Sequence, residues 1–105
     1  MIQIQTTTSN KPEAQKIADR LVKDRLAACA QVVGPISSTY RWQEKVEAAE
    51  EWLVLIKTRT ELFDNVEVAI RKINSYENPE IIASPIERSS NDYLSWVYAE
   101  TDSAE

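Results

Sequence analysis

The sequence has no histidine, one glycine and one cysteine. Without histidine, the chain lacks the commonest general base, every Ser-His or Cys-His nucleophile pair and any imidazole metal ligand. A single glycine, Gly34, excludes phosphate-binding loops of the GxxxxGK and GxGxxG types. An enzyme of this composition would have to use carboxylates, lysine, tyrosine or Cys29.

An excess of positive charge is also missing, because 17 acidic residues against 12 basic ones give a net charge of −5. This balance argues against nucleic acid and anionic membranes as partners. No segment approaches the ~18 consecutive apolar residues that span a bilayer, and the first residues show no leader-like pattern. Cys29 has no second cysteine with which to form a disulfide. We therefore expect a protein of the reducing cytoplasm.

The 105 residues, 43% of them apolar, are ordinary for one globular domain, which we expect to span residues 1–105 with 101–105 as a frayed tail. Alternation over residues 2–8 predicts a first strand. Asn10 and Glu13 then have the spacing of a helix cap. The helix that follows carries apolar residues at helical spacing: Ala14, Ile17, Ala18, Leu21, Val22 and Leu26.

Residues 29–42 are rich in β-branched and aromatic side chains and predict a second strand. Gly34-Pro35 interrupts it, and since proline cannot donate to a central ladder, we expect a bulge or bend there. Residues 43–51 are polar and predict an exposed hairpin tip. The run from Trp52 to Ile56 is apolar at every position, which predicts a third strand covered on both faces.

Thr58 or Thr60 is expected to cap a second helix with its apolar stripe over residues 62–73. Residues 80–87 predict a fourth strand, and Pro85 within it indicates an edge strand or a bulge. Residues 89–92 predict the cap of a short final helix. The order β-α-β-β-α-β is that of the ferredoxin-like split βαβ plait. The predicted fold class is therefore α+β, with a four-stranded antiparallel sheet, two main helices on one face and a short C-terminal helix.

In this plait the two helices cover one face of the sheet, whereas the third strand requires two covered faces. Copies of the same chain can supply the missing cover, so we predict a compact homo-oligomer. Tyr40 and Trp42, near the tip of the hairpin, fit the same explanation, because aromatic residues are enriched at interfaces. A platform on which a ligand stacks is the alternative interpretation of these two rings.

Three segments resemble the signatures of the CutA, or divalent-cation tolerance, family: residues 39–45 (TYRWQEK), 56–59 (IKTR) and 76–81 (YENPEI). Residues 25–29 (RLAAC) and 92–96 (DYLSW) extend the resemblance over nearly the whole chain. It implies a ferredoxin-like fold assembled as a tight homotrimer, similar in architecture to PII-type signalling proteins. In that assembly the hairpin reaches neighbouring subunits, which implies that Tyr40, Trp42 and Trp52 lie at the oligomer interface.

The same resemblance implies a non-catalytic protein involved in the response to metal ions such as copper. It also implies clefts between subunits that hold a metal ion or a small ligand, lined by Cys29, Lys57, Tyr76, Glu77 and Pro79. A PII-like small-molecule sensor and a structural or anchoring trimer without metal binding are the alternatives. An acylphosphatase-type enzyme on the same plait is disfavoured, since no glycine-containing loop follows the first strand.

In relatives with a proposed copper site, the ligands are a cysteine in the first strand and histidines just before the Tyr-x-x-Pro-Glu motif. The matching positions here are Thr6, Ile73 and Asn74. A copper site of that kind is not expected, because copper prefers imidazole and thiolate ligands. No metal ligand is assigned, and a divalent cation is a candidate cofactor only. The remaining donors would bind a hard cation weakly: Cys29, Glu44, Glu47, Glu50, Glu51, Glu77 and Glu80.

Lys57 follows the apolar run on the same side of the strand as Leu53 and Leu55. Its ammonium is therefore expected to be partly enclosed and to need an acidic partner, for which Glu77 is the candidate. A structural Lys-Glu pair and a ligand-binding cluster both remain open for these residues. Cys29, likewise, can be a buried small hydrophobe rather than a ligand.

Overall fold

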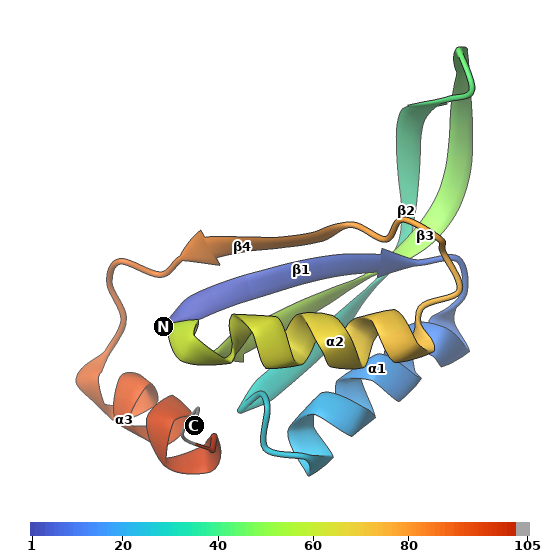
Figure 1. The fold of residues 1–105 in the computed structure, drawn as a ribbon. Helices are drawn as coiled ribbons and strands as arrows, with labels where there is room; N and C mark the ends of the chain where they lie inside the picture. The colour runs from blue at the N-terminus through green and yellow to red at the C-terminus, as the bar shows by residue number, and fades with distance from the viewer. Residues whose placement is uncertain (103–105) are drawn as a thin grey trace.

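The chain folds as a four-stranded sheet with two helices packed on one face, as a computed structural model of residues 1–102 shows (Figure 1). The strand order is β2-β3-β1-β4, and every neighbouring pair is antiparallel. The predicted α+β, ferredoxin-like plait is confirmed. The elements are β1 (Ile2–Thr8), α1 (Lys11–Lys23), β2 (Cys29–Trp42), β3 (Lys45–Thr58), the 3₁₀ turn η1 (Thr60–Leu62), α2 (Phe63–Ile73), β4 (Ile81–Pro85) and α3 (Asn91–Glu100).

Helix α1 begins as its sequence predicts. The Asn10 side chain accepts a hydrogen bond from the Glu13 amide at 2.9 Å, which satisfies one free amide of the first turn, and it donates one to the Glu13 carboxylate at 3.4 Å. The helix ends where Arg25 takes a left-handed conformation (φ 60°) and donates its amide to the Val22 carbonyl. Val22 is 43% exposed, so its place in the predicted apolar stripe was wrong.

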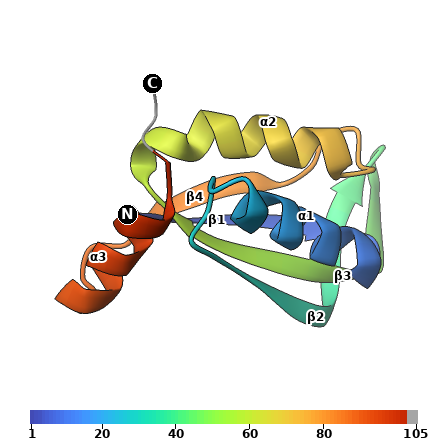
Figure 2. The same cartoon turned by 90° about the horizontal axis from the view of Figure 1, so that it is seen from below.

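The core lies between the sheet and helices α1 and α2 (Figure 2). On β3, the residues Trp52, Val54 and Ile56 pair with alternate residues of β1 and face the helices. Leu53 and Leu55 lie on the opposite face, which no helix covers in Figure 1, yet they are half-buried. The sequence predicted that both faces of β3 are covered; within one copy, helices cover only one of them.

The start of α2 differs from the prediction. Neither Thr58 nor Thr60 caps this helix; the chain instead passes through η1, and α2 starts after Leu62 without a side-chain cap. The Thr58 hydroxyl is buried and donates to the Leu26 carbonyl at 2.6 Å, so it is not available to cap α2. The predicted apolar stripe is confirmed, with Leu62, Val66 and Ile70 fully buried.

Strands β2 and β3 extend beyond the sheet as a long hairpin that rises on the side away from α1 and α2 (Figure 1). Pairing continues from Ile36 and Glu51 to Trp42 and Lys45, so the tip is a two-residue turn and residues 45–51, predicted as part of the tip, belong to β3. Backbone pairing needs no apolar side chains, which is why polarity alone placed the strand end wrongly. The break predicted at Gly34-Pro35 is confirmed as a register shift between Val33 and Ile36.

Helix α3 lies past the end of the sheet where β1 begins (Figure 2). Ser90 caps its start, as predicted for residues 89–92, by accepting from the Tyr93 amide at 3.2 Å. Thr101 and Asp102 were predicted to fray, but Thr101 is 4% exposed and the Asp102 amide donates to the Arg25 carbonyl at 2.9 Å. The rest of the predicted frayed tail, residues 103–105, lies outside the described residues.

Candidate functional site

The residues predicted to line one cleft lie in two groups at opposite ends of the sheet. Cys29 and Lys57 are cross-strand partners on β2 and β3, and Lys57 also pairs with Gln3 near the start of β1. The second group, Tyr76 to Pro79, follows α2 and contacts Glu51, six residues before Lys57 on β3. At ~3.4 Å per residue, that separation is about 20 Å. One copy of the chain therefore does not assemble the predicted cleft.

The first group centres on Lys57, a half-buried residue whose ammonium donates to the Gln31 amide oxygen at 2.6 Å. The predicted pairing with Glu77 is wrong within one copy, since Glu77 is an exposed residue of the other group. The reason is topological: the segment that carries Glu77 leads into β4, whose first residue Ile81 pairs with Thr6 near the end of β1, whereas Lys57 pairs with Gln3 near its beginning. Among residues 1–102, Lys57 forms no ion pair.

Cys29 lies half-buried at the start of β2, with Tyr93 of α3 beside it. Burial, followed by the neighbouring Cys29 thiol, raises the pKa of the Tyr93 phenol. Tyr93 therefore stays protonated at neutral pH and can donate a hydrogen bond toward the sulfur. Sequence reasoning did not include Tyr93 in the site, because nothing in the pattern of α3 shows which strand end it meets.

The second group centres on Glu51, whose side chain accepts a hydrogen bond from the Tyr76 hydroxyl at 2.7 Å. Glu51 is 8% exposed, although it was predicted to lie in a polar tip. Burial, then the hydrogen bond and the negative charge of Glu51, raise the pKa of Tyr76 above its ordinary value of 10.0, with Tyr40 and Glu13 nearby adding to the shift. The phenol is consequently a donor that keeps its proton throughout the physiological range.

The loop that carries Tyr76 is held rigidly by Asn74. The Asn74 side chain donates to the Thr7 carbonyl at 2.9 Å and accepts from the Tyr76 amide at 2.9 Å, and the Ser75 amide donates to the Glu13 carboxylate. Both ends of the Asn74 amide group are thus used in positioning the loop. Pro79 is buried in the same connection.

Thr6, Ile73 and Asn74, the positions that match copper ligands in some relatives, do not form a set of side chains that could bind a metal ion. Thr6 is fully buried, and its hydroxyl has no hydrogen-bond partner in the described chain. Ile73 packs against the core cluster, and Asn74 holds the loop. In residues 1–102, no group of three or more cysteine or acidic side chains is placed to hold a metal ion.

The three aromatic residues predicted at an interface have different surroundings. Tyr40 and Trp42 are 41% and 52% exposed on the hairpin. Trp52 instead faces the helices, packs against the core cluster and lies directly against Gly34. The Trp52 ring therefore packs largely against residues of its own copy, whereas the Tyr40 and Trp42 rings are exposed in residues 1–102.

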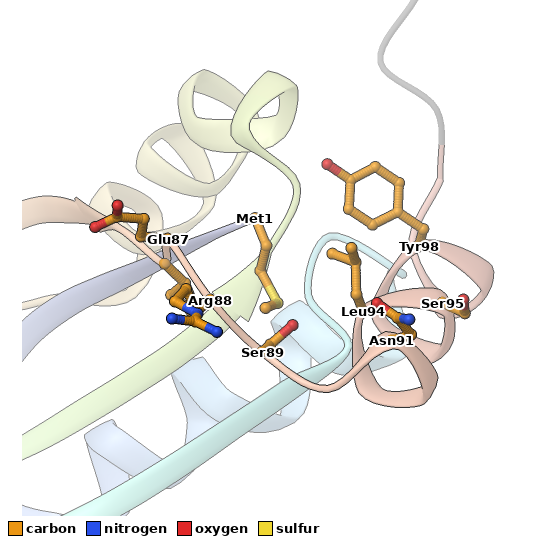
Figure 3. A pocket seen from close by; sticks show the side chains of 9 residues that line it. Met1, Glu87, Arg88, Ser89, Asn91, Leu94, Ser95 and Tyr98 are labelled. Atoms are coloured by element: carbon orange, nitrogen blue, oxygen red, sulfur yellow. The ribbon is translucent and has the colours of Figure 1, made fainter.

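A hollow of about 570 Å³ lies between the start of β1 and α3 (Figure 3). In Figure 3, Leu94 and Tyr98 of α3 face Met1, and Arg88 and Ser89 border the hollow from the loop before α3. None of the residues predicted to bind a ligand lines it. Its lining mixes exposed charged and apolar side chains, without convergent buried polar groups of the kind that fix a ligand.

Taken together, these features define a class: a ferredoxin-like α+β plait with one uncovered sheet face, a protruding β-hairpin and polar groups at both ends of that face. The family model of the CutA1 divalent ion tolerance protein matches residues 2–100. The divalent-cation tolerance protein CutA of Archaeoglobus fulgidus is 40% identical over 94 residues, which are 90% of this chain and 91% of the relative. This chain belongs to the CutA family of divalent-cation tolerance proteins.

Solved structures agree with this assignment. The divalent cation tolerance protein of Thermus thermophilus superimposes with a TM-score of 0.94 at 36% identity, covering 97% of this chain and all of that one. The A. fulgidus protein, described there as periplasmic, gives a TM-score of 0.93 at 38% identity, over 97% of this chain and all of its own. The family name refers to cation tolerance and states no reaction.

The location of this protein within the cell stays a prediction, since one relative is described as periplasmic. Among the described helices, none is long and apolar enough to cross a membrane.

Proposed function

We propose that this chain forms a homotrimer that binds a divalent cation or a small ligand in clefts between its copies, and so contributes to tolerance of metal ions such as copper. The observation that carries the proposal is the division of the predicted cleft into two incomplete groups. Cys29 and Lys57 lie at one end of the uncovered face, and Tyr76, Glu77 and Pro79 lie at the other. A neighbouring copy can bring one group to the other.

The uncovered face has the character of an interface. Leu53 and Leu55 are half-buried there, and Val33 and Ile82, on the same face by their pairing, are 44% and 52% exposed. At ~25 cal/mol per Å² of apolar surface, covering such side chains favours association. The exposed rings of Tyr40 and Trp42 on the hairpin extend this surface.

The available donors determine which cation fits. The chain has no imidazole and one thiol, so a copper site of the imidazole type does not fit its residues. Glu77 and Glu80 follow α2 as exposed carboxylates, and Cys29 would join them from a neighbouring copy. Carboxylates of this kind suit a weakly held, hard divalent cation. When bound, the cation would supply positive charge in the cleft, and Lys57 would favour an anionic ligand beside it.

Native mass spectrometry of the untagged protein tests the proposal, since a histidine tag would add the ligands that the chain lacks. The protein is titrated with Cu(II), Cu(I), Zn(II) and Mg(II), and then with pooled cytosolic metabolites. We expect a trimer that takes up three equivalents of a metal ion or a metabolite. A monomer at micromolar concentration, or a trimer that binds neither, would overturn the proposal.

Variants connect the binding to the cleft. Cys29→Ser and Glu77→Gln should each weaken the uptake, because each removes a donor from one of the two groups. Glu61→Gln is the matched control, since it removes an exposed carboxylate from η1, outside both groups. Equal losses in all three variants would show that the bound ions are held by general surface charge.

A further inference from the structure

Five charged side chains in residues 1–102 are at least half-buried, and three of them have partners that account for their burial. The Glu13 carboxylate accepts hydrogen bonds from the side chain of Asn10, which caps α1, and from the Ser75 amide. Arg59 donates to carbonyl oxygens at the end of α3, and Glu67 pairs with Arg71 at 3.1 Å. The two that remain are Glu51 and Lys57, which carry opposite charges.

In residues 1–102, each of these two groups has a single hydrogen-bond partner, and that partner is neutral. The Glu51 carboxylate, in a residue 8% exposed, accepts from the Tyr76 phenol, and the Lys57 ammonium donates to the Gln31 amide. A buried charge without a counter-ion is costly and is normally paired. No ion pair involves either residue in the described part of the chain. Within residues 1–102 neither group has a counter-ion, and a neighbouring copy can supply one.

Glu51 and Lys57 cannot serve one another within one copy. They lie on the same strand, β3, six residues apart, which is about 20 Å. Alternation places both on the side of β3 that carries Leu53 and Leu55, the face that α1 and α2 leave uncovered. The uncovered face thus presents an isolated negative charge at one end, an isolated positive charge at the other and apolar side chains between them.

We infer that, between neighbouring copies, the Lys57 ammonium of one copy pairs with the Glu51 carboxylate of the next. The inference rests on the proposed trimer and names the residues that join its copies. In a ring, each interface brings together two different patches of the chain, so one end of the face can meet the opposite end on the neighbour. Three such pairs close the ring, and each leaves no lone buried charge.

The pair also defines the cleft. Since Lys57 arrives beside Glu51 and Tyr76, it brings Cys29, its cross-strand partner, to the loop that carries Glu77. The Glu51 carboxylate is then occupied by the phenol and the ammonium, and is not available to a metal ion. Cation binding falls to Glu77 and Glu80 at the rim.

A double-mutant cycle tests the pair. Glu51→Gln, Lys57→Met and the double variant are compared by sedimentation equilibrium for the strength of trimer association. Removing one member of a buried charge pair leaves the other unpaired, so each single variant should associate at least about 30-fold more weakly, the equivalent of ~2 kcal/mol. The double variant should be no weaker than the weaker single variant. Losses that multiply in the double variant would overturn the pair.

Matched controls separate the pair from general charge and from the phenol. Glu61→Gln in η1 and Lys72→Met in α2 alter exposed residues away from the uncovered face and the hairpin, and should leave association unchanged. Tyr76→Phe removes the neutral partner of Glu51 and keeps its charge, so association should weaken less than in Glu51→Gln. A wild-type protein that is monomeric would refute the proposed trimer itself, whereas a wild-type trimer with multiplicative losses would refute the pair alone.

Zero-length carbodiimide crosslinking tests the same pair in the wild-type protein, so its result does not depend on whether a variant folds. A mixture of ¹⁴N- and ¹⁵N-labelled chains, exchanged into mixed trimers, should yield a Glu51–Lys57 isopeptide between a heavy and a light chain. Trimers in which Lys57 is linked to Glu77, or in which other inter-chain links form without this one, would overturn the inference.

Discussion

Replacing Gly34 by alanine should destabilise the protein through one steric conflict. A Cβ atom at Gly34 would lie 2.4 Å from Cδ1 and 2.7 Å from Cγ of the Trp52 ring, where ordinary carbon contacts are ~3.5–4.0 Å. The overlap is therefore about 1 Å. The ring cannot easily move away, because it packs against the core cluster, and no unusual backbone angle at Gly34 adds to the effect.

The expected net cost is about 1.3 kcal/mol per chain. Overpacking of this kind costs ~1–3 kcal/mol, and the reduced freedom of the unfolded chain returns ~0.4–1 kcal/mol. The measurement is urea denaturation followed by circular dichroism at one fixed protein concentration, since the stability of an oligomer depends on concentration.

The decisive comparison uses a Trp52→Leu background, in which the ring that causes the conflict is absent. There, Gly34→Ala should cost less than about 0.5 kcal/mol, or even stabilise the protein. An equal cost in both backgrounds would refute the steric explanation.

Three further predictions address other parts of the chain. Folding raises the pKa of Tyr76 above the unfolded value of about 10, so the protonated phenol stabilises the fold below that pH, and this stabilisation is lost as the pH rises further. The urea midpoint of the wild type should therefore fall between about pH 9 and 11, and it should fall less steeply in Tyr76→Phe. An equal slope in both proteins would contradict the assignment. Gln43 and Glu44 form the hairpin turn with φ of 48° and 66°, a left-handed conformation that asparagine and glycine adopt more easily. The double variant Gln43→Asn, Glu44→Gly should therefore raise the free energy of unfolding by about 1 kcal/mol in the same assay. A lower free energy of unfolding would show that the two native side chains make contacts worth more than the strain. Arg59→Met removes the guanidinium that donates to carbonyl groups at the end of α3. The rate of amide hydrogen exchange in α3 should therefore rise about ten-fold or more, while the rate in α1 is unchanged. Equal changes in both helices would argue against a local role for Arg59.

Most of the fold could be predicted because its signals are local. The alternation of residues 2–8, the cap formed by Asn10 and Glu13, and the interruption at Gly34-Pro35 are each contained within a few neighbouring residues. Errors arose where a distant partner decides the outcome. The Thr58 hydroxyl was predicted to cap α2 and instead donates to the Leu26 carbonyl, and polar residues 45–51 form strand because β2 lies beside them.

The site could be predicted as a set of residues but not as an arrangement. Family resemblance selected Lys57 and Glu77, and the expectation that an enclosed ammonium needs an acid is sound. Which acid lies near it depends on where the α2–β4 connection enters the sheet, and that connection places Glu77 at the opposite end. Glu51 was assigned to an exposed tip because its sequence neighbours are polar; only its burial against Tyr76 distinguishes it from Glu50.

By itself, the sequence determined the class of the fold, the family, and the chemistry that the chain cannot perform. Periodicity, caps and composition are properties of short segments and of totals, so they need no knowledge of distant contacts. The tertiary structure decided that Glu51 and Lys57 form no ion pair within residues 1–102, and that the predicted cleft is divided between two ends of one face. Those facts depend on strand register and on the length of β3, which bring together or hold apart residues that the sequence lists without regard to distance.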